Sequence, residues 1–422
     1  MRQYKYSYYW FFKYLLIVAL LSTSQAFAKG TFYSAKELKG PWEWSMSSVR
    51  VSHQELGGYA PLTKIEATEN VKIKAYQILY WTSDMAGQKT LASGLVRLRS
   101  DLFGSSKKIP VISFQHSARF VRSDGPSVQV ADPEGVFGAI YHAPYGYLWA
   151  MPDYLGLGVS KLPQAYLNSR VQAQTSSDFL DAVLEWSQLM QMNIDTNLIL
   201  MGYSQGGHAT LALQKYLENP QTKTPFKVRY SVPMAGPYSV SDVSLFEEIK
   251  SNSASRYLFV AMAIYGFSFD PELEVELGEV IDPKFADIIP KVLSGEISFT
   301  EATKLLPSKA NDFFTKKFLK DLFNGGALNL LRSFAKQDLI EWTPKAPVYL
   351  FHAPDDESVS FRNSVLAQKS FQARGSQVEL KELPTGLGHI QVTLAAHYQA
   401  SKLLTKLNPK AESNHIPQAP KK

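Results

Sequence analysis

The strongest chemical signal in the chain is residues 202–206, which read Gly-Tyr-Ser-Gln-Gly and match the pattern Gly-x-Ser-x-Gly. An apolar run at 197–202 leads into the serine, and a helix-forming run at 206–217 follows it. A strand that turns this tightly into a helix leaves no room for side chains at the glycines and projects the serine hydroxyl above the sheet. A glycine-rich structural turn is the alternative, but the flanking strand and helix favour Ser204 as a nucleophile.

A serine hydroxyl needs a neighbouring base, which is most often a histidine. On a strand–serine–helix turn the order along the chain is serine, acid, histidine. Of the histidines far enough downstream, His397 falls within a predicted helix and His415 in the terminal tail. His389 ends a flexible loop that can aim an imidazole at Ser204, and it is the predicted base. His208, one helical turn beyond the serine, is the main rival.

An acid must orient the histidine. The turn after an apolar run at 347–351 carries three consecutive carboxylates, Asp355, Asp356 and Glu357. Only one of them is needed, and the other two are expected to be solvated or to cap the next helix. Asp338, just before the same run, is a more remote alternative.

Acyl transfer also requires N–H donors for the negatively charged oxygen of the intermediate. The backbone N–H of Gln205, the residue after the nucleophile, is the first predicted donor. The second is expected in the loop 115–119, and we assign it to the backbone N–H of Ser117. His116 and Arg119 in this loop are expected either to contact the substrate or to hold the loop in place.

The elements that position these residues alternate between strands and helices, which implies right-handed βαβ units in one sheet. The predicted fold class is therefore α/β, with a mostly parallel central sheet flanked by helices. Two predicted strands, 77–82 and 92–99, alternate apolar and polar residues as half-exposed antiparallel strands do. Buried strands are predicted at 109–114, 147–151 and 197–202, final strands at 347–351 and 377–381, and helices at 177–191, 206–217 and 390–404.

One long segment interrupts this alternation. Residues 237–342 are helical in character, rich in Phe, Leu and Tyr, and contain no convincing strand, so we predict an inserted helical cap. The core then consists of residues 29–236, which begin with an N-terminal arm, and residues 343–405. Residues 406–422 are predicted to be a disordered tail.

The composition excludes several functions. The 422 residues are 45% hydrophobic and 19% charged, which is typical of a globular protein. The 44 basic and 38 acidic residues leave a net charge of +6 without any long run of like charges, so we expect no nucleic-acid binding. The chain has no cysteine, no H-E-x-x-H pattern and no phosphate-binding glycine loop, so we expect no disulfide, metal or cofactor.

The first 28 residues have the pattern of a secretory signal peptide. A basic and aromatic start leads into the apolar run 14–21, and Ala26-Phe27-Ala28 fits the pattern that signal peptidases cleave. A membrane anchor is the alternative, but the run is too short to cross about 30 Å of hydrocarbon. We predict an exported protein, either periplasmic or secreted.

These residues resemble the α/β-hydrolase superfamily, and within it the secreted lipases and esterases that have a large helical cap. Residues 152–158, Pro-Asp-Tyr-Leu-Gly-Leu-Gly, are similar to the P-D-Y-x-G-x-G stretch of secretory lipases. Residues 352–359 resemble their H-G-x-x-D-x-x-V acid turn, and this resemblance selects Asp356 as the acid. Gly388-His389 resembles the loop that ends in the base.

The resemblance extends from about residue 75 to residue 405, although the cap matches only in position and helical character. It implies an α/β-hydrolase fold and hydrolysis of carboxylic esters through an acyl-enzyme intermediate, without a cofactor. Acylglycerols and other lipid esters are the implied substrates, with transient contact with lipid surfaces. Two residues depart from the pattern, because Ala353 and Ser117 stand where glycine is usual.

The predicted function is that of an exported serine hydrolase of carboxylic esters, which uses Ser204, Asp356 and His389 as its catalytic residues. A serine peptidase on the same fold would use the same three residues. A non-catalytic binding module on a hydrolase scaffold is the third hypothesis. It is less favoured because all three positions carry competent residues.

Overall fold

The computed structural model describes residues 32–39, 43–45, 71–251, 253–273 and 275–408. The predicted signal peptide at 1–28 lies outside the described residues, as does most of the predicted tail, residues 409–422. Within the described ranges, none of the helices has both the length and the apolar character needed to cross a membrane.

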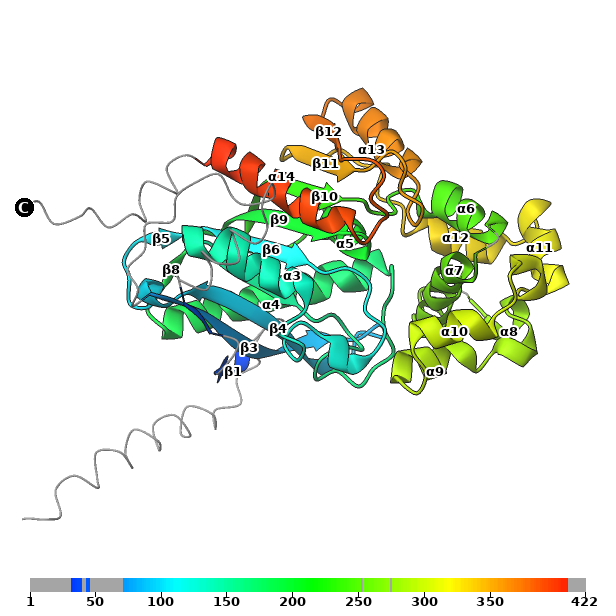
Figure 1. Ribbon diagram of the computed structural model, residues 1–422, viewed down its shortest axis with the longest axis horizontal. Helices are drawn as coiled ribbons and strands as arrows, with labels where there is room; N and C mark the ends of the chain where they lie inside the picture. Colours follow the sequence, from blue (N-terminus) through cyan, green and yellow to red (C-terminus); the bar gives the residue numbers. More distant parts are fainter. Residues whose placement is uncertain (1–31, 40–42, 46–70, 252, 274, 409–422) are drawn as a thin grey trace, which may run out of the picture.

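A ten-stranded sheet forms the centre of the molecule (Figure 1). Pairing is antiparallel from β1 through β3 and β4 to β7, and parallel along β7-β6-β9-β10-β11-β12. The predicted α/β class with a mostly parallel sheet is confirmed. The strands are β1 (Phe32–Leu38), β2 (Trp44–Ser45, paired with β3), β3 (Lys72–Ser83), β4 (Lys89–Arg99), β6 (Val111–Gln115), β7 (Leu148–Pro152), β9 (Asn197–Tyr203), β10 (Lys227–Met234), β11 (Val348–His352) and β12 (Val378–Glu382). The short strands β5 (Lys108–Ile109) and β8 (Asn193–Ile194) pair separately.

Helices cover both faces of this sheet. The side chains of β9 alternate between the two faces, because Leu198 and Leu200 pack in a cluster with α4 and α5, whereas Ile199 and Met201 pack in a cluster with α14. The helices that flank the sheet are α3 (Pro133–Phe137), α4 (Ser169–Leu189), α5 (Gln205–Leu217), α13 (Arg362–Ala373) and α14 (Val392–Leu407). Helix α4 starts eight residues before the predicted boundary at 177, where the Asn168 side chain accepts a hydrogen bond from the Val171 N–H.

Strand β4 is more buried than its alternating pattern predicts, since every residue from Ala92 to Arg99 is buried. Its polar residues are not solvated. Arg97 donates to the Val130 carbonyl (2.7 Å), and Arg99 donates to the Pro144 carbonyl (3.1 Å). The segment around α3 thus covers a face of β4 that the sequence predicts to be half exposed.

Strand β10 has no counterpart among the predicted elements, and helix α13 was expected only as a helix without stated bounds after the acid turn. The β10 sequence starts with exposed charged residues and contains Pro233, so its strand pattern is weak. Helix α14 ends at Leu407, and Asn408 is buried with its amide donating to the Tyr230 hydroxyl (2.5 Å). Residues 406–408 therefore belong to the folded core rather than to the predicted tail.

Between β10 and β11 the described chain forms helices and no named strand. Figure 1 shows them grouped together beyond one end of the sheet. They share an apolar cluster that includes Tyr257, Phe267, Phe313 and Phe314 and is separate from the clusters beside the sheet. The helices are α6 (Leu245–Lys250), α7 (Ala254–Phe267), α8 (Leu277–Val280), α9 (Ile288–Ser294), α10 (Phe299–Leu305), α11 (Lys316–Phe323) and α12 (Leu328–Ala335).

The carboxyl ends of the parallel strands meet at one edge of the sheet. The register pairs Gln115 at the end of β6 with Gly202 near the end of β9, and His352 at the end of β11 with Glu382 at the end of β12. The loops that leave this edge carry all the residues predicted to act in catalysis. Ligands of open α/β sheets bind at this edge.

Candidate active site

The turn between β9 and α5 holds Ser204 in a strained conformation, with φ 57° and ψ −122°. Two close backbone approaches explain the flanking glycines. A Cβ atom at Gly202 would overlap the carbonyl oxygen of Gly206, and a Cβ atom at Gly206 would overlap the carbonyl oxygen of Gln115. Such strain persists only where the surrounding structure enforces it, and it is common at functional sites.

The structure brings the predicted nucleophile, base and acid into one hydrogen-bonded chain. His389 Nε2 lies 2.9 Å from Ser204 Oγ, and His389 Nδ1 lies 2.6 Å from Asp356 Oδ2. An ionised carboxylate only accepts hydrogen bonds, so the imidazole proton is on Nδ1 and Nε2 is free to accept from the serine hydroxyl. This arrangement can remove a proton from Ser204 when its oxygen attacks a carbonyl carbon.

Asp356 is held in its ionised form. Burial alone would raise the pKa of this carboxyl, but hydrogen bonds from His352 and His389 lower the pKa well below its usual value. Asp356 Oδ1 also accepts the backbone N–H groups of Ser358 (2.9 Å) and Val359 (2.8 Å). The carboxylate is therefore fixed from several sides.

His352 is a partner of the acid that the sequence analysis missed. Its Nε2 lies 3.0 Å from the Val359 carbonyl oxygen and 3.3 Å from Asp356 Oδ2, and both of these atoms are acceptors. Its Nδ1 lies 2.7 Å from Ser364 Oγ, so the Ser364 hydroxyl donates to it. Only the acid-turn motif, which begins with this histidine, pointed to the position.

The other two carboxylates of the acid turn are exposed to solvent, as expected, and each also accepts a hydrogen bond from the loop that carries His389. Asp355 Oδ2 accepts the Gly386 N–H at 2.7 Å. Both Glu357 oxygens lie 3.0 Å from the His389 N–H. All three carboxylates of the turn thus bind the loop that carries His389.

The rival residues lie elsewhere in the fold. His208 is fully buried with Nε2 2.9 Å from the Gln337 carbonyl oxygen, and burial lowers its pKa to about 4. His397 is buried in α14 beside the Phe114 ring, and burial lowers its pKa to about 3. Asp338 accepts from the Ser241 N–H (2.9 Å). His415 lies outside the described residues.

The prediction for the second oxyanion donor disagrees with the structure. The Ser117 N–H donates to the Glu134 carboxylate, 3.0 Å from Oε2, and the Ser117 hydroxyl donates to Oε1 at 2.6 Å. Its N–H is therefore occupied and cannot serve the substrate in this conformation. By contrast, the Gln205 N–H at the start of α5 and the Ala118 N–H have no acceptor among the described residues.

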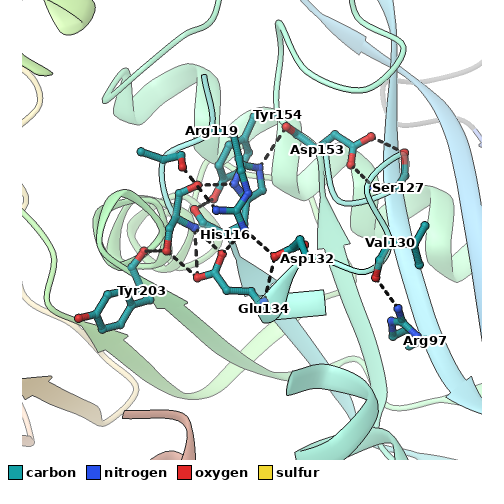
Figure 2. A network of polar contacts seen from close by, with 12 residues as sticks. Arg97, His116, Arg119, Ser127, Val130, Asp132, Glu134, Asp153, Tyr154 and Tyr203 are labelled. Atoms are coloured by element: carbon teal, nitrogen blue, oxygen red, sulfur yellow. Dashed lines mark hydrogen bonds and ion pairs between the residues drawn. The ribbon is translucent and has the colours of Figure 1, made fainter. Parts of the chain in front are cut away.

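A buried ion cluster holds the loop that contains Ser117 (Figure 2). Arg119 Nη2 lies 2.7 Å from both Asp132 Oδ1 and Glu134 Oε2. Burial raises the pKa of Glu134, although the charge of Arg119 acts in the opposite direction. Arg119 thus serves to hold the loop, one of the two roles expected for it.

His116 and Asp153 make further buried hydrogen bonds next to this loop. His116 Nε2 lies 3.1 Å from the Asp153 carbonyl oxygen, and the imidazole is fully buried. The Asp153 carboxylate accepts the Ser127 N–H at 2.7 Å (Figure 2). Both residues therefore act inside the fold rather than in contact with Ser204.

The loop after β6 also reaches the helices between β10 and β11. The Phe120 ring stacks on Phe299 of α10, with the ring centroids 4.2 Å apart. Ala118 and Phe120 pack against the apolar cluster that these helices share. Within the described part of the chain, no group of three or more His, Asp or Glu side chains is arranged to hold a metal ion.

Comparisons with known proteins agree on the fold. No family model and no curated protein matches the sequence. A protein described as a hydrolase from Legionella pneumophila matches with a TM-score of 0.78 and 24% identity, over 90% of this chain and 98% of its own. A ligand-bound form of the rice cell wall degrading esterase LipA from Xanthomonas oryzae matches with a TM-score of 0.76 and 24% identity, over 90% and 98%.

Candida antarctica lipase A in its closed state is a more distant match, with a TM-score of 0.61 and 14% identity over 93% of this chain and 84% of the lipase. The chain thus has the α/β-hydrolase fold, and the predicted likeness to esterases and lipases of that fold is confirmed at the level of structure.

Proposed function

We propose that this protein is a serine hydrolase that cleaves carboxylic esters through an acyl-enzyme intermediate. The hydrogen-bonded chain from Ser204 through His389 to Asp356, with distances of 2.9 and 2.6 Å, carries this proposal. The esterase and lipase descriptions of its structural relatives support esters as the substrate class.

In the proposed mechanism, Ser204 Oγ attacks the ester carbonyl carbon while His389 Nε2 accepts the hydroxyl proton. Asp356 stabilises the imidazolium that forms, which then gives its proton to the departing alcohol. Water next attacks the acyl-enzyme with His389 again acting as the base, and the acid product leaves.

The tetrahedral intermediate needs two N–H donors for its oxygen. The Gln205 N–H at the start of α5 is the first in this proposal. The Ala118 N–H takes the place predicted for Ser117, because it is next in the loop and has no acceptor among the described residues.

We propose lipid esters as the substrate class. The loop after β6 packs on the apolar cluster of the cap through Ala118 and Phe120, so the cap offers an apolar surface next to the proposed oxyanion donors. We also propose export, on the basis of the A-x-A pattern that ends at Ala28. Mass measurement of the mature protein tests this proposal and should find Lys29 as the first residue.

The test of the activity compares the wild-type protein with Ser204→Ala on p-nitrophenyl esters of graded acyl length. We expect the substitution to lower kcat by about 10⁶-fold, to the background rate, with folding intact. Ser294→Ala, at an exposed serine of α9, is the matched control and should behave as wild type. A fluorophosphonate probe should label the wild type and the control but not Ser204→Ala.

Three results would contradict the proposal in different ways. Full activity of Ser204→Ala would exclude the assigned nucleophile. Faster hydrolysis of aminoacyl or prolyl amides than of esters would favour a serine peptidase. Absence of both hydrolysis and probe labelling in the wild type would favour a binding module.

A further inference from the structure

His389 lies in a loop without regular structure, between the end of β12 at Glu382 and the start of α14 at Val392. Two glycines, Gly386 and Gly388, precede it in this loop, and Gly386 has a positive φ of 79°. A base carried by such a loop needs fixed contacts, because a displacement of about 1 Å at a catalytic group can cost about 100-fold in rate.

Both backbone polar groups of His389 are anchored by side chains. On one side, its N–H donates to the Glu357 carboxylate, whose two oxygens both lie 3.0 Å away. On the other side, its carbonyl oxygen accepts the hydroxyl of Tyr203 at 2.6 Å. The Tyr203 ring also packs against the imidazole, with centroids 5.1 Å apart.

The two anchors are the sequence neighbours of the other two members of the proposed triad. Tyr203 immediately precedes Ser204, and Glu357 immediately follows Asp356. Each element that supplies a catalytic side chain therefore also supplies a contact that fixes the backbone of His389. The position of the base is tied directly to the nucleophile and to the acid.

We propose that Glu357 and Tyr203 are positioning residues, which hold the His389 backbone so that the imidazole bridges Ser204 and Asp356. The inference rests on the proposed function and adds residues to it. The Asp356 bond fixes the direction of the ring only after the Cα atom has been placed. With its N–H and its carbonyl both bound, the peptide units on each side of that Cα atom are fixed.

The chemistry of the two contacts suits this role. A backbone N–H bound to an ionised carboxylate is stronger than a neutral hydrogen bond. Burial raises the pKa of Tyr203 well above its usual value, so the phenol keeps the proton it donates to the His389 carbonyl. Glu357 is exposed, so its removal is expected to change global stability little.

The experiment measures kcat and KM on a p-nitrophenyl ester for wild type, Glu357→Ala, Glu357→Gln and Tyr203→Phe. Glutamine keeps one acceptor oxygen for the His389 N–H, and phenylalanine keeps the ring but not the hydroxyl. Glu382→Ala is the matched control, because Glu382 is an exposed glutamate at the start of the same loop whose side chain contacts no partner among the described residues.

We expect Glu357→Ala to lower kcat by about tenfold, while KM stays within about twofold. Glu357→Gln should recover most of this loss. Tyr203→Phe should lower kcat several-fold and leave KM nearly unchanged. The rate of fluorophosphonate labelling at Ser204 should fall in parallel, because it depends on the same base. A purely structural role would instead lower the thermal midpoint and leave kcat per folded molecule unchanged.

Wild-type kcat in both Glu357→Ala and Tyr203→Phe would overturn the inference, as would an equal loss in Glu382→Ala. These results leave the proposed function standing, because the wild type would still hydrolyse esters in a Ser204-dependent manner. Absence of Ser204-dependent hydrolysis in the wild type would overturn both.

Discussion

The turn that carries Ser204 and the loop that carries His389 are fixed by different physical means. The turn is fixed by steric exclusion, because the backbone passes so close at Gly202 and Gly206 that only glycine fits. The loop is fixed by polar contacts, because the three carboxylates of the acid turn and one phenol hold its backbone and its imidazole.

This difference predicts how each region responds to substitution. A rigid steric turn fails abruptly when one atom is added, and the failure extends to folding. A loop held by several hydrogen bonds loses function in steps, each step depending on which contact is removed. The first two of the following predictions test this contrast, and the third concerns a residue outside both regions. They run from the largest expected effect to the smallest.

The largest effect is expected for Asp356→Asn, which changes the hydrogen bond that sets the tautomer of His389. The amide can donate to Nδ1, so the proton moves to Nε2 and the imidazole can no longer accept from Ser204. We expect kcat to fall by about 10⁴-fold, measured by steady-state hydrolysis of a p-nitrophenyl ester. Asp355→Asn is the control, since its side-chain oxygen can still accept the Gly386 N–H. An equal loss of kcat in both variants would contradict the explanation through the His389 tautomer.

Gly206→Ala is expected to have the next largest effect, on both stability and activity. The added Cβ overlaps the Gln115 carbonyl oxygen, and backbone atoms cannot move aside cheaply. We expect a loss of about 3 kcal/mol in the free energy of unfolding and at least ~100-fold in kcat, measured by urea unfolding and ester hydrolysis. Gly278→Ala in α8, where the new Cβ has no neighbour within 4 Å, should preserve both.

The smallest effect concerns acid stability and leaves the site intact. His397 is buried without a hydrogen-bond partner among the described residues, and burial lowers its pKa to about 3. Its folded pKa lies below the unfolded value of about 6.5, so the unfolded chain binds the proton first as the pH falls. The free energy of unfolding therefore decreases between about pH 6.5 and pH 3, and this contribution is fully present only above that range.

Replacing His397 with phenylalanine should remove this acid sensitivity, because the ring packs among Phe114, Phe137 and Trp149 and needs no proton. Between pH 7.5 and pH 5, we expect the variant to lose about 2 kcal/mol less unfolding free energy than the wild type. Urea unfolding at the two pH values measures this, and kcat at pH 7.5 should be unchanged. An identical acid loss in both proteins would show that the residue is not a source of the sensitivity.

The contrast between turn and loop also explains what the sequence could predict. The glycines around Ser204 are local and have a steric cause, so five residues and their flanking elements were enough to locate the candidate nucleophile. His389 and Asp356 were selected as the candidate base and acid from their places after predicted strands and from resemblance. The alternation of buried strands and helices gave the fold class, because burial on both faces leaves a clear apolar pattern.

The sequence failed where a distant side chain decides the outcome. The Ser117 N–H was predicted to face the substrate, but Glu134, in a separate helix, binds it. The roles of Asp355 and Glu357 depend on a loop about thirty residues away, and no local pattern encodes such a contact. Strand β10 was missed because Pro233 and its charged start weaken a pattern that only its two neighbouring strands make clear.

The acid turn has a consequence for the evolution and engineering of this chain. Asp355, Asp356 and Glu357 are consecutive, and each must meet a different atom of the opposing loop. Inserting or deleting one residue before them would shift all three contacts at once, whereas substituting any single residue alters only one. The length of this turn is therefore constrained along with the identity of Asp356, and loop grafts or circular permutations should leave it uncut.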